Sequence, residues 1–180
     1  IFENNKVINI ELLDDFWKTS LEKGQIIKSK ILINASGPWI NETMKSIIKV
    51  NSNKKIRLVK GSHIIINKLY NEDVAFTLQN DDKRIVFVIP YNEKFSLIGT
   101  TEVEVNSPDE NKIDDFEISY LIDCVNKYFI KQISKNDIID TYSGIRPLIE
   151  DFKEATKVTR DYIFDLNTIN KLPILSIYGG

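Results

Sequence analysis

The chain is poor in the residue types that form covalent and metal-bound sites. Cys124 is the only cysteine and His63 the only histidine among 180 residues. A single cysteine excludes a disulfide within the chain and any multi-cysteine metal site, and it agrees with a reducing compartment. We therefore expect no metal ion in this chain.

Sequence motifs of several common chemistries are also missing. The chain has 7 glycines, and none of them forms part of a glycine-rich phosphate loop or a Gly-x-Ser-x-Gly sequence. Its longest nearly uncharged apolar runs, residues 31–40 and 85–91, fall far short of the ~20 residues that span a bilayer. A formal net charge of -2 gives no field that attracts nucleic acid, so nucleic acid is not an expected partner.

Apolar and polar residues alternate over many short segments, which is typical of strands. Strands are predicted at residues 7–13, 16–21, 25–35, 56–66, 74–78, 84–90, 95–105, 138–145, 158–166 and 174–178. Most of them are joined by short turns, and residues 84–90 and 95–105 are predicted to form a hairpin. Residues 99–101 interrupt its second strand, where Gly99 marks a bulge or a ligand that faces the strand. This order favours an antiparallel or mixed sheet flanked by helices, an α+β fold, over a repeating βαβ pattern.

Two helices are predicted. The first follows Pro38 and would place Ile40, Met44, Ile47 and Ile48 on one face. The second covers residues 115–129 and is preceded by Asp114, which lies three residues before Glu117 as in a capping box. The second helix is expected to pack on a sheet and to carry no chemistry.

Arg146 lies in a segment, residues 142–148 (YSGIRPL), that restricts its backbone. Pro147 disfavours helical geometry for Arg146, and Gly144 permits a tight bend or a close backbone approach. A guanidinium held in this way is a fork for a carboxylate or a phosphate. The alternative is that Arg146 pairs with a surface acid such as Glu150.

His63 is a second candidate, at the front of a strongly apolar strand. An imidazole has an ordinary pKa of ~6.5, so it is the side chain here that accepts a proton at neutral pH without a large shift. Gly61 and Ser62 precede it and favour a bent turn that faces a ligand. The alternative is a hydrogen-bonded histidine at a sheet edge.

Arg160 is a third candidate, in a predicted strand beside Asp161. Neighbouring strand residues face opposite sides of a sheet, so Asp161 is poorly placed as its partner. Arg146 and Arg160 on neighbouring strands would form a double clamp for a dianionic phosphate. From these residues alone, the chain is an anion-binding α+β domain whose reaction stays open.

Eight short segments carry a resemblance to a known family. They are residues 34–39 (NASGPW), 60–64 (KGSHI), 78–80 (LQN), 84–91 (RIVFVIPY), 98–101 (IGTT), 142–148 (YSGIRPL), 159–162 (TRDY) and 175–180 (LSIYGG). In this order they resemble the central region of the flavin-dependent, quinone-reducing glycerol-3-phosphate dehydrogenases. The resemblance covers residues 31–180, and residues 1–30 add only a compatible set of strands.

The resemblance implies two interwoven parts and a set of site residues. Residues 1–40 and 164–180 would be pieces of a Rossmann-like FAD-binding domain, and residues 41–163 a substrate-binding cap built on an antiparallel sheet. His63 and Arg146 would lie at the substrate in front of the flavin ring, and Arg146 and Arg160 would hold its phosphate. The residues that would contact FAD are Ala35, Ser36, Gly37, Gly179 and Gly180.

The implied reaction is the oxidation of sn-glycerol 3-phosphate to dihydroxyacetone phosphate, with hydride passing from C2 to flavin N5 and electrons passing on to quinone. The C2 hydroxyl is too weak an acid to ionise at pH 7, so His63 would take its proton as hydride leaves. The arginines would position the substrate and the flavin would perform the redox step. The resemblance also implies that the full-length protein contacts the cytoplasmic face of the inner membrane peripherally, in a bacterium or an organelle.

The sequence departs from the family pattern in several places. Ser36 stands where the family usually has threonine, and Glu102 where it usually has aspartate. The G-x-G-x-x-G fingerprint that cradles the FAD pyrophosphate is absent, as is the lysine-containing segment that usually follows Gly179 and Gly180. We therefore expect a truncated chain that is inactive alone and does not retain FAD stoichiometrically, an expectation that flavin absorbance co-purifying one to one would contradict.

Two other functions remain open. One is an amine or amino-acid oxidase of the same flavoprotein superfamily, which would use one arginine for a carboxylate where two arginines suit a phosphate. The other is a non-catalytic anion-binding fragment. A neighbouring reading frame that encodes G-x-G-x-x-G would favour an intact enzyme.

Overall fold

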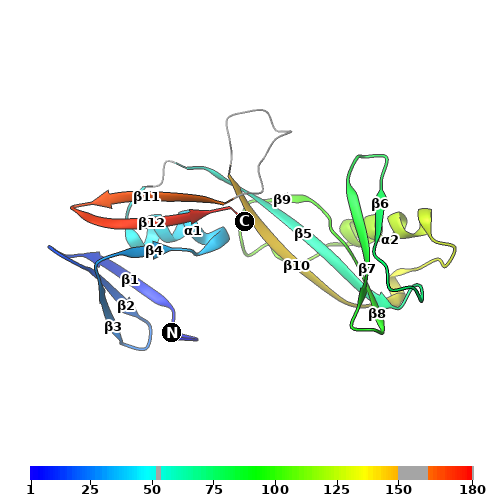
Figure 1. Ribbon diagram of the computed structural model, residues 1–180, viewed down its shortest axis with the longest axis horizontal. Coiled ribbons are helices and arrows are strands. Elements are labelled where there is room, and N and C mark those ends of the chain that lie inside the picture. Colours follow the sequence, from blue (N-terminus) through cyan, green and yellow to red (C-terminus); the bar gives the residue numbers. More distant parts are fainter. Residues whose placement is uncertain (52–53, 150–161, 180) are drawn as a thin grey trace. The chain divides into compact units, whose positions relative to one another are not determined.

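The computed structural model describes residues 1–51, 54–149 and 162–179 (Figure 1). The chain divides into two compact units: a terminal unit, Ile1–Arg57 with Arg146–Gly180, and a central unit, Leu58–Ile145. The boundaries fall within two long strands, β5 (Ile56–Asn67) and β10 (Ile138–Ile149), so each of these strands contributes residues to both units.

The boundaries of the two compact units differ from those of the predicted domains. The predicted domains meet between residues 40 and 41 and between residues 163 and 164. In the structure, the helical segment after residue 37 belongs to the terminal unit. Which unit binds FAD and which binds the substrate stays a prediction.

The terminal unit contains two small sheets. The first is an antiparallel meander of β1 (Val7–Leu12), β2 (Trp17–Leu21) and β3 (Ile26–Ser29). The second has the order β11-β12-β4, with β11 (Ile163–Ile169) antiparallel to β12 (Leu172–Tyr178), and β4 (Leu32–Asn34) parallel to β12. Figure 1 shows the orange and red strands of the β11–β12 hairpin beside α1.

The predicted first helix is present as three successive short segments. These are η1 (Gly37–Trp39) with 3-10 turns, α1 (Ile40–Glu42), and η2 (Thr43–Ile48) with wider π turns. Met44 and Ile48, four residues apart, are buried with Ile174 of β12 and Trp17 of β2. The Trp17 Nε1–H also donates to the carbonyl of Pro173 at 3.1 Å, which joins the two sheets of this unit.

The strand predicted at residues 25–35 is wrong in extent, because the chain leaves one sheet and enters another within it. Residues 26–29 pair with β2, whereas residues 32–34 pair with β12. The exposure of the side chains alternates on each side of the break, but Lys30 and Ile31 are both exposed, and this pattern does not report which strand is the partner. Of the strand predicted at residues 158–166, residues 158–161 lie outside the described residues.

The central unit is built on a sheet with the order β10-β5-β8-β7-β6, and a short strand, β9, pairs with β5 beside β8. The interruption predicted near Gly99 is confirmed, since it separates β8 from β9. The other elements of this unit are β6 (Phe76–Gln79), β7 (Ile85–Tyr91), β8 (Phe95–Gly99), β9 (Val103–Val105), α2 (Asp115–Tyr128) and η3 (Lys135–Asp137).

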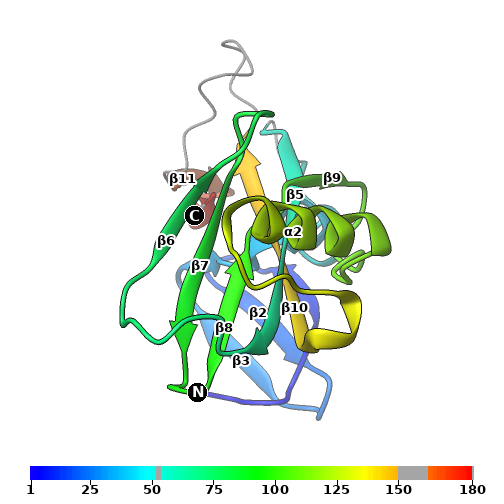
Figure 2. The same ribbon diagram turned by 90° about the vertical axis from the view of Figure 1, so that its right-hand side faces the viewer.

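Helix α2 covers one face of this sheet, as predicted (Figure 2). Leu121 and Val125 of α2 are fully buried, with Ile64, Val88 and Ile98 of the sheet in the same core. The predicted capping box is also present: the Asp114 side chain accepts from the Glu117 N–H, and the Glu117 side chain accepts from the Asp114 N–H. The predicted α+β class is confirmed. Among the described residues, the helices are too short or too polar to cross a bilayer.

Replacing Leu121 by alanine should lower the free energy of unfolding of the central unit by about 2–5 kcal/mol, because it opens a cavity between α2 and the sheet. Phe116 is a matched control on the same helix, since its side chain is 88% exposed. Phe116→Ala should change stability by about 0.5 kcal/mol or less. Urea unfolding followed by helical circular dichroism measures both, and equal effects would contradict this packing of α2.

Candidate functional site

His63 lies in the middle of β5, half-buried, on the sheet face opposite α2. Across the sheet it is opposite Gly99 of β8, which is in turn opposite Phe87 of β7. On this face β7 also carries Ile85, Ile89 and Tyr91, each 38–46% exposed within the described residues. His63 is therefore a polar group on a largely apolar sheet face.

Gly99 makes room for the His63 ring. A Cβ atom built on Gly99 would overlap the imidazole carbons of His63. The requirement is steric, because the backbone of Gly99 has no positive φ. The sequence predicts a bulge or a ligand that faces the strand at Gly99, and the group that faces Gly99 in the structure is the His63 ring.

Tyr142 of β10 holds the other side of the imidazole. The ring centroids of His63 and Tyr142 lie 4.6 Å apart, and their planes are within 6° of parallel. Two residues along β10, the position of a Cβ on Gly144 meets no atom of the described residues within 4 Å. Of the bend and the close backbone approach that Gly144 permits, the bend is not observed, since β10 continues from Ile138 to Ile149. Gly144 instead leaves open space beside the stacked pair.

The predicted clamp of Arg146 and Arg160 is not tested by the described residues. Arg146 lies in β10 with the extended backbone that Pro147 predicts, but it belongs to the terminal unit. Arg160 lies outside the described residues, as does Glu150, the alternative partner of Arg146. The clamp stays a prediction.

The expected turn at Gly61 and Ser62 is not observed, because both residues lie within the continuous strand β5. Ser62 is fully buried and points toward α2, away from the His63 face. A buried hydroxyl needs hydrogen-bond partners, and Ser62 has them on the helix side of the sheet.

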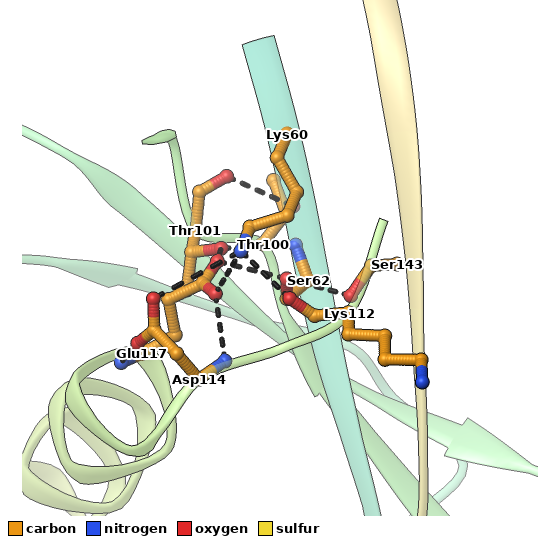
Figure 3. Close-up of polar contacts among 8 residues, drawn as sticks. All are labelled: Lys60, Ser62, Thr100, Thr101, Lys112, Asp114, Glu117 and Ser143. Atoms are coloured by element: carbon orange, nitrogen blue, oxygen red, sulfur yellow. Dashed lines mark hydrogen bonds and ion pairs between the residues drawn. The ribbon is translucent and has the colours of Figure 1, made fainter. Parts of the chain in front are cut away.

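These partners form a buried polar network around Glu117 (Figure 3). Glu117 Oε1 accepts hydrogen bonds from Ser62 Oγ at 2.8 Å and from Thr101 Oγ1 at 2.6 Å. Its Oε2 lies 2.9 Å from the ammonium nitrogen of Lys60. Ser62 Oγ is also 2.8 Å from Ser143 Oγ of β10. We call these five residues the Glu117 network.

The network keeps Glu117 ionised. Burial raises the pKa of a carboxyl group, but the hydrogen bonds from Lys60, Thr101 and Ser62 and from the Asp114 N–H together hold the pKa of Glu117 below its ordinary value. The Lys60 ammonium also donates to the carbonyl of Lys112 at 2.7 Å. Both charges of the buried pair are thus compensated.

The residues expected to contact FAD lie in the terminal unit. Ala35 and Ser36 line a groove of about 620 Å³ whose other walls are mainly apolar side chains. Ser36 Oγ donates to Asn34 Oδ1 at 2.7 Å, which fixes the segment after β4. Gly37 and Gly179 have φ values of 56° and 84°, where glycine is favoured. Gly180 lies outside the described residues.

These features fit the expected cofactor. A mainly apolar groove is what a large planar ring system requires. In the part of the chain that the structure describes, no atom lies within 4 Å of the position of a Cβ on Gly37, so a ligand can approach its backbone. Ala35, Ser36, Gly37 and Gly179 are the described residues that would hold FAD.

Sequence reasoning missed the roles of Tyr142 and Glu117. Tyr142 lay within a recognised segment, but stacking across two strands depends on a strand pairing that the sequence does not display. Glu117 was interpreted only as a capping residue. A signal existed in β5, where Lys60 and Ser62 occupy the same buried face as Ile64. Polar residues on a buried strand face require a buried partner.

Replacing Gly99 by alanine should displace His63 and destabilise the central unit by about 1–3 kcal/mol, because the added methyl group overlaps the imidazole. Gly144→Ala is the matched control: it should be neutral or stabilise the chain by up to about 1 kcal/mol, since its position is open. Urea midpoints measure stability, and the proton resonances of the single histidine report the ring position. Equal behaviour of the two variants would argue against this placement of His63.

Replacing Glu117 by glutamine should destabilise the central unit by about 3–5 kcal/mol at neutral pH, because it leaves the Lys60 ammonium buried without its carboxylate. Asp115 offers a control in the same helical turn: its carboxylate is exposed and pairs only at the surface with Lys135, at 2.6 Å. Asp115→Asn should change the urea midpoint little.

The cost of Glu117→Gln should also depend on pH. Folding lowers the pKa of Glu117, so its carboxylate adds stability above the pKa of ~4.3 that it has when unfolded. This contribution is lost as the pH falls through the folded pKa. The difference between wild type and variant should be constant from about pH 7 to 5 and shrink in more acidic solution. A difference that never shrinks would mean that Glu117 is not the ionised partner of Lys60.

Comparisons with known proteins agree with the sequence resemblance. Aerobic glycerol-3-phosphate dehydrogenase from Escherichia coli (strain K12) is 46% identical over 152 residues, which are 83% of this chain and 30% of that protein. D-erythritol 1-phosphate dehydrogenase from Brucella abortus (strain 2308) is 39% identical over 155 residues, which are 85% of this chain and 31% of that protein. The chain thus spans about a third of the length of these curated relatives.

A solved structure has the same fold. Glycerol-3-phosphate dehydrogenase from Bacillus halodurans complexed with FAD matches 99% of this chain and 35% of its own, with a TM-score of 0.79 and 21% sequence identity. A family model described as FAD dependent oxidoreductase matches residues 1–165. The predicted flavoprotein class and its cofactor, FAD, are therefore confirmed, and the chain belongs to the FAD dependent oxidoreductase family.

Proposed function

We propose that the chain is part of a flavoprotein that oxidises sn-glycerol 3-phosphate to dihydroxyacetone phosphate. The observation that carries this proposal is the setting of His63. Its ring occupies the space left by Gly99 and stacks on Tyr142, next to the open space at Gly144. This setting occurs in a chain that is 46% identical, over 152 residues, to a relative named for glycerol 3-phosphate.

His63 is the proposed catalytic base. Oxidation of a secondary alcohol removes a hydride from carbon and a proton from oxygen, and the hydroxyl holds its proton at neutral pH unless a base accepts it. Among the described residues, His63 is the imidazole available for that role. Stacking on Tyr142 restricts rotation of the ring and so holds its nitrogens in one orientation toward the substrate.

The arginines and the groove supply binding. Arg146 and Arg160 are proposed to hold the phosphate, since a guanidinium binds phosphate oxygens through two parallel hydrogen bonds. Ala35, Ser36, Gly37, Gly179 and Gly180 are proposed to contact the flavin. When bound, FAD supplies the hydride acceptor for the reaction.

The electron acceptor and the location of the protein are part of the same proposal. We propose quinone as the acceptor and peripheral contact of the complete protein with the cytoplasmic face of the inner membrane. The resemblance of the sequence to the quinone-reducing dehydrogenases is what supports the proposed acceptor and the proposed membrane contact. Flotation of the complete protein with vesicles tests the membrane contact, and reduction of a soluble quinone in the presence of sn-glycerol 3-phosphate tests the electron acceptor.

D-erythritol 1-phosphate is a second candidate substrate, because a relative named for it is 39% identical over 85% of this chain. Both candidates are phosphate esters of polyols, so the proposed arginine clamp serves either one. An amine or amino-acid substrate fits less well, because its carboxylate needs only one arginine. A non-catalytic anion-binding fragment would need neither His63 nor FAD.

Dye reduction by the complete polypeptide that contains this chain tests the proposal. The substrates are sn-glycerol 3-phosphate, D-erythritol 1-phosphate, glycerol and sarcosine. We expect turnover of a polyol phosphate and not of glycerol or sarcosine. His63→Asn should lower kcat by about 10²–10⁴-fold, because it removes the base and keeps a similar shape. Arg146→Ala should lower kcat/KM for the phosphate ester.

Arg84 provides the matched control for Arg146. It pairs with Asp82, with the two side chains 38% and 37% exposed, and its guanidinium stacks on Tyr120 at 4.1 Å from the ring centroid. Arg84→Ala should keep the activity. Turnover of glycerol as readily as its phosphate, or of sarcosine, would show that the substrate assignment is wrong.

A further inference from the structure

The Glu117 network lies directly beneath the proposed base. In β5, Ser62 faces the network and the next residue, His63, faces the opposite side of the sheet. In β10, Ser143 faces the network and the preceding residue, Tyr142, stacks on His63. The same two strand segments thus meet twice, once through hydroxyl groups and once through aromatic rings.

We propose that Glu117, Ser62 and Ser143 are positioning residues, which fix β5 against β10 so that Tyr142 holds the ring of His63. None of the three touches the imidazole on the opposite face of the sheet. They act on it through the strands to which Ser62 and Ser143 belong. This proposal rests on the proposed function only in taking His63 as the base.

The hydrogen bonds of the network have a definite direction. The ionised carboxylate of Glu117 only accepts, so Ser62 Oγ donates its single proton to Glu117 Oε1 at 2.8 Å. The contact of 2.8 Å between Ser62 and Ser143 must then be donated by Ser143. A chain of hydroxyl groups that ends on a charge is stronger and more directional than one between neutral groups.

Thr101 closes the network at the gap between β8 and β9. The backbone N–H of Ser62 donates to Thr101 Oγ1 at 2.9 Å. In a regular sheet this N–H would donate to the carbonyl of a neighbouring strand. The Thr101 N–H donates to the carbonyl of Ser62 at 3.2 Å, and its hydroxyl donates to Glu117 at 2.6 Å. Backbone and side chain of Ser62 are both fixed, one residue before His63.

Stability alone does not account for such a network. A buried ion pair gains little free energy over apolar side chains of similar volume, because both charges lose their hydration. Helix α2 already has an apolar core through Leu121 and Val125. A directional contact between β5 and β10 supplies what apolar packing does not, a single arrangement of the two strands beside His63.

The measurement is the proton spectrum of His63 in the 180-residue chain, where it is the only histidine and needs no assignment. A ring stacked face to face on Tyr142 lies in the shielding region of the tyrosine, so its resonances should be shifted upfield. Tyr142→Leu defines the unstacked position. Ser143→Ala and Glu117→Gln should move the resonances toward that position, and Ser143→Thr, which keeps the hydroxyl, should restore them.

Ser119→Ala is the matched control, since Ser119 is an exposed serine of α2 outside the network. It should leave the His63 resonances unchanged. If Ser143→Ala lowers the thermal midpoint and leaves the His63 resonances at their wild-type position, the network is merely structural and the proposal is overturned. If Ser143→Ala does not fold, Thr101→Val replaces it, because it removes a donor to Glu117 and keeps the shape of the side chain.

A second readout uses the complete polypeptide. Ser143→Ala should lower kcat by about tenfold or more with KM unchanged, since a displaced base affects the chemical step and not substrate binding. If no substrate is turned over but the resonances move as expected, the proposed function fails and the positioning role stands. If a polyol phosphate is turned over but the resonances do not move, only the positioning role fails.

Discussion

The pleat of β5 is the constraint on which the central unit depends. Because neighbouring residues of a strand face opposite sides of its sheet, Ser62 and His63 are committed to different environments. The side that faces α2 is dry and holds an ionised carboxylate with its donors. The other side holds an imidazole on an apolar surface. A slip of one residue in the pairing of β5 would exchange the two environments and bury His63 beneath α2.

In the terminal unit, the main constraint is the burial of a parallel pair of strands. Its parallel pair, β4 and β12, needs cover on both faces, since parallel sheets are ordinarily buried on both sides. The helical segment from Gly37 to Ile48 covers one face through Met44 and Ile48. On the other face Ile33 is 59% exposed and Phe164 of β11 is 61% exposed within the described residues. Ala35 and Ser36 follow β4 directly, so this short strand positions the groove proposed for the flavin.

Much of the fold could be predicted from local patterns. The hairpin of β7 and β8, helix α2 with its capping box, and the interruption after Gly99 all have signals within a few residues of each other. The division between β3 and β4 could not, because the local sequence of residues 26–34 does not identify the pairing partner of each part. The conformation at Gly144 could not be chosen for a related reason. Glycine permits a bend but does not require one, and pairing with β5 keeps β10 extended.

The candidate site was predicted in its parts and not in its connections. His63 stood out as the only histidine, and Arg146 through the proline that follows it. Their surroundings depend on contacts between residues far apart in sequence, such as the stacking of His63 on Tyr142. The role of Glu117 in the network was missed for another reason, because the predicted capping box already gave this residue a function. A carboxylate has enough acceptor sites to cap α2 and to bind the donors of the network.

This double role of Glu117 has a consequence for α2 as a rigid element. One oxygen of the carboxylate accepts from the Asp114 N–H at the start of the helix, and the other accepts from β5 and Thr101. An α-helix turns through about 100° and rises about 1.5 Å for each residue. Sliding or rotating α2 by a single residue would therefore remove the carboxylate from its donors on β5 and from Thr101 at once, although the Asp114 N–H moves with the helix. The helix is locked in phase as well as in place, so an insertion or deletion in its first turn should be far less tolerated than one at its C-terminal end.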